Sequence, residues 1–194
     1  MSMDSEIIST GFWRWLQGAG LERFELMRAS DAWIFRGTIL AQVAEGAFEA
    51  RYELVCDKTF LTRRAQIHVR GPAGERTLAI SAENGRWHAN GSETASVRGA
   101  LDIDLGWSPS TNTLPIRRIG LQVGRSSGEF TAAWVRFPGL TLEPLSQEYV
   151  RLSQRLYRYS SRGGAFTAQL HVDDQGLVVD YQGFWQRVRA EEHT

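Results

Sequence analysis

Hydrophobic and polar residues alternate with a period of two along most of the chain. Residues 47–56, AFEARYELVC, place Phe48, Tyr52 and Leu54 on one face of an extended segment and the charged side chains on the other. Residues 33–43, WIFRGTILAQV, alternate in the same way. Such alternation is typical of a strand that buries one face in a core and exposes the other to solvent.

Short glycine-bearing segments separate these runs. Glycine and asparagine adopt the positive φ that tight connections between antiparallel strands require. Five such segments each predict a hairpin: 44–47, 70–75, 82–86, 124–129 and 172–177. The pattern therefore predicts an all-β protein, a single antiparallel β-roll or barrel of many strands with few or no helices, in one domain over residues 1–194.

Residues 146–160, SQEYVRLSQRLYRYS, fit two interpretations. The spacing of the apolar residues behind a serine matches an amphipathic helix with an N-cap. Read with a period of two, the end of the same segment is an aromatic strand. We favour two strands with a break near Ser153.

A repeated pentapeptide suggests an internal relationship. AQIHV at 65–69 recurs as AQLHV at 168–172, and each copy precedes a glycine turn, a short apolar strand and a tryptophan. One interpretation is that the domain consists of two related halves, approximately 20–105 and 115–189, joined by residues 106–114. The other is chance similarity between amphipathic strands, whose sequences are repetitive.

The segment DIDLGWSPSTNTLPIRRI, residues 102–119, lies where the two halves would meet. Under the two-half interpretation, residues 100–105 form the last strand of the first half. Residues 115–123 then form the first strand of the second half, and the intervening turn-rich residues join them.

Composition and charge narrow the classes of function. The chain has 194 residues, with 22 Lys and Arg against 22 Asp and Glu. A balanced charge disfavours nucleic acid and an anionic membrane surface as partners. Cys56 is the single cysteine, so we expect it to be a small buried residue and exclude an internal disulfide. The N-terminal ten residues lack the features of a signal peptide, and no run approaches the length of a membrane span, so we expect a cytoplasmic protein.

Several motifs are candidates for chemistry. Asp102 and Asp104 would project from one face of a strand, where they could act on a sugar-bearing substrate or pair with Arg117 or Arg118. The segment GRSSG at 124–128 matches a nucleophile elbow, but a strand rather than a helix follows it, so we expect a hairpin turn.

Metal and cofactor sites find little support in the sequence. His68 and His171 occupy matching positions in the two pentapeptides, but two histidines without a third ligand are weak evidence for a metal. There is no phosphate-binding glycine loop and no dinucleotide fingerprint, so we expect no cofactor and no metal. The seven tryptophans either fill the core or line a cavity for a lipid or sugar.

The chain resembles a family of bacterial proteins named for glycolipid binding and formerly classed as a domain of unknown function. The resemblance rests on residues 102–105, 108–109, 111–118, 137–151, 157–161 and 173–181. It implies an all-β roll similar to bacterial lipoprotein carriers, which enclose acyl chains, and non-catalytic binding of a glycolipid or another lipid-like molecule. The alternatives are an enzyme using the two aspartates and a protein-interaction module without a small ligand. The residues expected to bind the ligand are Asp102, Asp104, Trp107, Asn112, Arg117 and Arg118.

Overall fold

The alternating segments form the strands of a computed structural model, which describes residues 5–188. The first strands are β1 (Glu6–Trp15), β2 (Ala19–Arg28), β3 (Ala32–Val43), β4 (Gly46–Asp57), β5 (Thr62–Gly71), β6 (Gly74–Glu83), β7 (Arg86–Ala89) and β8 (Ser92–Glu93). The later strands are β9 (Ile103–Leu105), β10 (Phe130–Arg136), β11 (Thr141–Arg151), β12 (Leu156–Ser161), β13 (Phe166–Val172), β14 (Val178–Tyr181) and β15 (Trp185–Arg187). The helical segments are the 3-10 turns η1 (Ala95–Val97) and η2 (Ser110–Asn112) and the helix α1 (Thr113–Ile119).

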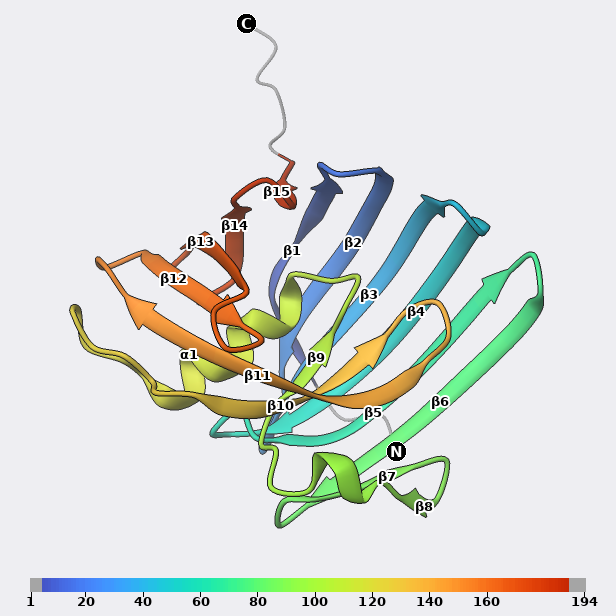
Figure 1. The fold of residues 1–194 in the computed structure, drawn as a ribbon, viewed down its shortest axis with the longest axis horizontal. Helices are drawn as coiled ribbons and strands as arrows, with labels where there is room; N and C mark the ends of the chain where they lie inside the picture. The colour runs from blue at the N-terminus through green and yellow to red at the C-terminus, as the bar shows by residue number, and fades with distance from the viewer. Residues whose placement is uncertain (1–4, 189–194) are drawn as a thin grey trace, which may run out of the picture.

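The fifteen strands within residues 5–188 belong to one sheet (Figure 1). Its order is β8-β7-β6-β5-β4-β3-β2-β1-β15-β14-β13-β12-β11-β10-β9, so the first and last of these strands pair in the middle. Neighbours are antiparallel except β9 and β10, which are parallel. The predicted all-β class is confirmed, and because β8 and β9 do not pair with each other the sheet is an open roll rather than a closed barrel.

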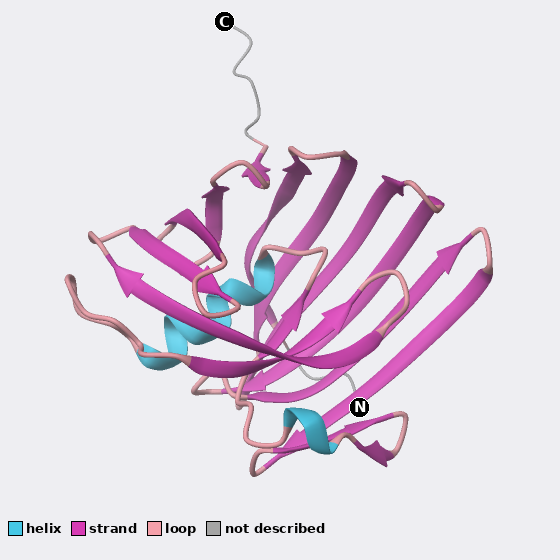
Figure 2. Ribbon diagram, in the orientation of Figure 1, coloured by secondary structure: helices cyan, strands magenta, loops and turns pink. Residues whose placement is uncertain are grey.

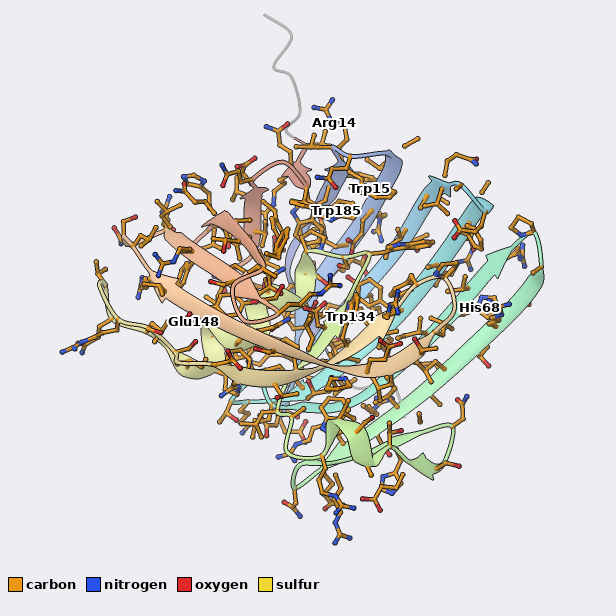
Figure 3. The ribbon with its side chains drawn as sticks, viewed as in Figure 1. Arg14, Trp15, His68, Trp134, Glu148 and Trp185 are labelled. Atoms are coloured by element: carbon orange, nitrogen blue, oxygen red, sulfur yellow. The ribbon has the colours of Figure 1, made fainter. Side chains whose placement is uncertain are left out.

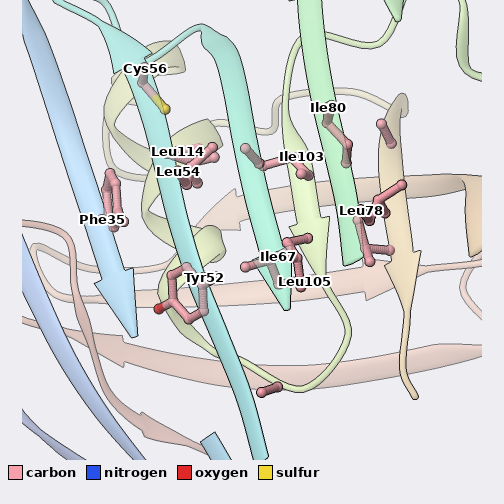
Figure 4. Packing of buried hydrophobic residues seen from close by; sticks show 14 of the residues in the cluster. Phe35, Tyr52, Leu54, Cys56, Ile67, Leu78, Ile80, Ile103, Leu105 and Leu114 are labelled. Atoms are coloured by element: carbon pink, nitrogen blue, oxygen red, sulfur yellow. The ribbon is translucent and has the colours of Figure 1, made fainter. Parts of the chain in front are cut away.

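The β9 edge of the sheet is rolled inside the first eight strands. Ala132 and Ala133 are consecutive in β10 and therefore face opposite sides, yet both are 0% exposed. On one side, Ile103 and Leu105 of β9 pack in the main core against residues of β4 and β5, such as Ile67 (Figure 4). The sheet therefore covers part of its own inner face.

The hollow of the roll contains the segment that the sequence predicts to join two halves. Figure 2 shows η2 and α1 surrounded by strands, and residues 108–116 are buried. The predicted strand at 115–123 is wrong. Pro115 lies in the first turn of α1, where a backbone N–H has no partner within the helix, so proline is tolerated there. Gly120 ends the helix with a φ of 60°.

Other strand predictions have mixed outcomes. The segment 146–160 forms the end of β11 and the start of β12 with a break between them, so the two-strand interpretation is confirmed. Four of the five predicted hairpins are confirmed. The one at 124–129 is wrong, because a helix and a loop precede it and only the strand that follows is as predicted.

The remaining observations concern one predicted strand, the repeated pentapeptides and the ends of the described residues. Of the strand predicted at 100–105, residues 103–105 form β9, which pairs with β10. The pentapeptides lie within β5 and β13. Residues 1–4 of the N-terminal segment and position 189, the expected end of the second half, lie outside the described residues. Among residues 5–188, the helices are too short to cross a membrane.

Candidate ligand-binding site

The first of the two aspartates fixes the helix to the sheet. Asp102 is 1% exposed, and Arg118 of α1 donates to both of its carboxylate oxygens over 2.5–3.2 Å. Burial raises the pKa of Asp102, and the adjacent guanidinium opposes this rise. The pairing of an aspartate with an arginine of this segment is confirmed, and it leaves both groups engaged within the protein.

The polar residues of η2 and its neighbours also bond to the protein interior. Asn112 donates from Nδ2 to the carbonyl of Pro109 over 3.1 Å and accepts from the Tyr149 hydroxyl over 2.8 Å. The Thr113 hydroxyl donates to the carbonyl of Gly176 over 3.0 Å. These bonds satisfy a buried loop that would otherwise leave backbone and side-chain groups unpaired.

A buried carboxyl group that the sequence reasoning missed lies beneath η2. Glu22 is 0% exposed, and its Oε1 accepts from the hydroxyls of Tyr52 over 2.6 Å and Ser108 over 2.8 Å. Among the described residues its Oε2 has no hydrogen-bond partner. Burial raises the pKa of Glu22 from its ordinary 4.5 to about 8, although the two hydroxyl groups act in the opposite direction.

A cavity of about 210 Å³ remains between the helical segment and the rolled strands, and we call it the inner cavity. Asp104 lines it and accepts a hydrogen bond from Nε2 of Gln147. Burial raises the pKa of Asp104 to about 6 against the effect of this bond. The remaining lining residues are Leu105, Gly106, Ser108, Asn112, Trp134, Leu145, Tyr159, Ser161, Arg162, Phe166, Tyr181, Phe184 and Trp185.

Aromatic rings form the walls of the inner cavity. Trp134, labelled in Figure 3, is one of the lining residues, and the guanidinium of Arg162 lies 5.4 Å from the centroid of its ring. Phe166, Tyr181 and Phe184 pack against one another with centroids 5.1–6.4 Å apart. The cavity therefore combines flat apolar surfaces with a carboxylate, a guanidinium and several hydroxyl groups, which together suit a ring that carries hydroxyl groups.

The tryptophans take both of the roles that the sequence leaves open. Trp13, Trp87 and Trp185 are buried in the main core, and Trp185 also lines the inner cavity together with Trp134. Trp15 stacks on Trp185 with centroids 6.1 Å apart, next to the cavity (Figure 3).

Of the six residues expected to bind a ligand, Asp104 and Asn112 line the inner cavity. Asp102 and Arg118 pair with each other. Trp107 stacks on Phe137 at 5.2 Å and contacts Phe48 edge-on at 5.7 Å, so it joins the β10–β11 turn to β4. Arg117 is exposed and lines a separate hollow of about 340 Å³.

Most of the lining residues were not selected from the sequence, because they come from strands that are distant along the chain. Two segments of the sequence contribute several of these lining residues and could have indicated them. YRYSS contributes Tyr159 and Ser161, and DYQGFW contributes Tyr181, Phe184 and Trp185. The sequence signal for Glu22 is a charged residue at an inward position of an alternating strand, because it shares the inward face of β2 with Phe24.

The other motifs have local partners on the surface. His68 lies 3.2 Å from Glu75, and His171 lies 3.8 Å from Asp180. Within residues 5–188 no three His, Cys, Asp or Glu side chains are grouped to hold a metal ion. Cys56 is buried, as predicted. Ser126 of the elbow-like segment donates to Glu148 over 2.5 Å.

The fold and the inner cavity together define an all-β roll with an aromatic, polar-lined pocket. A family model described as "Putative glycolipid-binding" matches residues 10–187, and the chain belongs to this family. The chain is also similar to the crystal structure of a DUF1089 family protein from Pseudomonas aeruginosa, with a TM-score of 0.80 and 36% sequence identity over 87% of this chain and 92% of that one. No curated protein matches the sequence.

Proposed function

We propose that the protein binds a glycolipid without catalysis and holds the sugar head group in the inner cavity. The observation that supports this most directly is the position of Trp134 beside Asp104 and Arg162. An aromatic face can stack on a sugar ring while the carboxylate and guanidinium exchange hydrogen bonds with its hydroxyl groups.

The size of the inner cavity limits what enters it. At about 210 Å³ it lies below the ~300 Å³ at which pockets for drug-sized molecules begin. It suits a group of one sugar ring and leaves no room for a long acyl chain. Asp104 is the single carboxylate among the described lining residues, and this supports binding rather than acid–base catalysis, which commonly divides its roles between two groups.

Native mass spectrometry of freshly purified protein, followed by lipid extraction, tests the proposal. We expect a co-purifying glycolipid that is retained in Arg136→Ala and lost in Arg162→Ala. The two variants are matched because both arginines lie over the Trp134 ring, Arg136 at 5.1 Å and Arg162 at 5.4 Å from its centroid. They differ in that Arg162 lines the inner cavity and Arg136 does not. Repeated absence of any lipid from the wild-type protein contradicts the proposal.

A further inference from the structure

The outer face of the sheet carries a second hollow, which is apolar and which we call the outer groove. It has a volume of about 750 Å³ and crosses β1 to β5 near one end of these strands. Leu21 and Leu40 are direct cross-strand partners within it, and they are 38% and 52% exposed. Towards the middle of the same strands the outer face carries charged residues such as Arg23 and Arg36, and near their other end it carries a separate buried cluster that includes Met27 and Ile34. Two exposed leucines side by side at a hollow indicate a binding surface.

Strand register arranges the outer groove as a line across the sheet. Arg14 pairs with Leu21, Leu21 with Leu40, Leu40 with Glu49, and Glu49 with Arg70. Five neighbouring strands at about 4.8 Å spacing give a line of about 19 Å, whose apolar part, Leu21 and Leu40, lies next to Arg14. Beside this line, small side chains keep the groove open: those of Ala19 and Ala47, which flank Gln42.

The charge at one end of the line indicates which molecule fits. Glu49 pairs with Arg51 at 2.8 Å, and Arg70 pairs with Glu75 at 2.9 Å. Arg14 forms no ion pair within the described part of the chain, and its one side-chain hydrogen bond is to Gln186 over 3.3 Å. Figure 3 shows Arg14 at the upper rim of the sheet. A cation at the end of an apolar groove complements an anionic group at the end of an alkyl chain.

We propose that the outer groove binds the acyl chain of a single-chain anionic amphiphile and that Arg14 binds its carboxylate or phosphate head. This site lies on the opposite side of the sheet from the inner cavity and does not depend on the sugar site proposed above. The apolar contact comes from Leu21 and Leu40, and the selectivity for an anionic head comes from Arg14.

The test is a fluorescence titration of the full chain with a fluorescent long-chain polyene fatty acid and with its methyl ester. We expect Leu40→Ser to weaken binding of both probes by about tenfold, because the chain loses an apolar wall. We expect Arg14→Gln to weaken binding of the acid several-fold and to leave the ester unchanged. A lysophosphatidate that displaces the acid assigns the head to phosphate, and displacement only by fatty acids assigns it to carboxylate.

The control is Leu152→Ser, because Leu152 is a 39% exposed leucine in the β11–β12 connection, away from the groove. Equal loss of binding in Leu152→Ser and Leu40→Ser overturns the proposal. Binding that survives Leu40→Ser but is lost in Trp134→Ala places the chain in the inner cavity and also overturns it, while leaving the sugar site intact. If the probes do not bind and Leu40→Ser instead converts a dimer to a monomer in sedimentation, the groove is a self-association surface and the proposal fails.

Discussion

The buried Glu22 predicts a strong dependence of stability on pH. Its pKa is about 8 in the folded protein against an ordinary 4.5, so the folded state holds the proton more tightly than the unfolded state. The stability that this group contributes is therefore fully present below pH 4.5 and is lost as the pH rises through 8. At ~1.4 kcal/mol per pH unit, the loss amounts to about 5 kcal/mol of the free energy of unfolding.

Replacing the carboxyl group by an amide removes this titration. In Glu22→Gln the amide oxygen can still accept from Tyr52 and Ser108, but the NH₂ group brings two donors to a position where the protonated carboxyl has one O–H, and that position has no partner among the described residues. The additional unpaired buried donor costs roughly 1–3 kcal/mol. At pH 5 we therefore expect the variant to be slightly less stable than wild type. At pH 9 we expect it to be more stable, by roughly 2–4 kcal/mol.

Urea denaturation followed by tryptophan fluorescence at several values between pH 5 and 9 measures the difference. Subtracting the two proteins at each pH cancels the groups that titrate in both. Glu45→Gln, in the exposed β3–β4 turn, is the matched control and should change stability by the same small amount at both ends of the range. A difference between wild type and Glu22→Gln that stays constant with pH would refute the reasoning.

Three further predictions follow from single contacts. Arg118→Ala should lower the free energy of unfolding by about 3–5 kcal/mol in chemical denaturation, because it leaves the buried carboxylate of Asp102 unpaired. Arg117→Ala should lower it by less than ~1 kcal/mol, because the interaction of its guanidinium is with an aromatic ring, and equal losses in the two variants would contradict this. Gly37→Ala should be strongly destabilising, since its Cβ would lie 2.2 Å from a tyrosine ring, while Gly139→Ala, with nothing within 4 Å, should leave the melting temperature nearly unchanged. Because the pKa of Asp104 is about 6, sugar affinity measured by calorimetry should change between pH 5 and 7 in wild type and not in Asp104→Asn.

Strands were predictable where they bury one face and expose polar residues on the other, as in β4. Phe48, Tyr52 and Leu54 alternate with charged residues, and β4 places them inward as the pattern requires. The helix at 113–119 was not predictable in this way. Its leucine, proline and isoleucine are buried on nearly every side inside the roll, so no amphipathic period marks it.

The site was less predictable than the fold. DIDL and the arginines at 117 and 118 concentrate charge, and the sequence favours them as ligand contacts. In the structure Asp102 and Arg118 neutralise each other, because burying either group alone would be unfavourable. Asp104 reaches the cavity because β9 turns its side chain toward Gln147 of β11. This depends on the rolling of the sheet, which brings together strands that local patterns do not relate.

The most direct test of the central claim uses a ligand without an acyl chain, so that the outer groove cannot contribute. Saturation-transfer NMR with a panel of methyl glycosides measures contact between sugar protons and the protein. The account predicts a signal for at least one glycoside that persists in Arg136→Ala and disappears in Arg162→Ala, since Arg162 alone of the two lines the inner cavity. Signals of equal strength in both variants would contradict it.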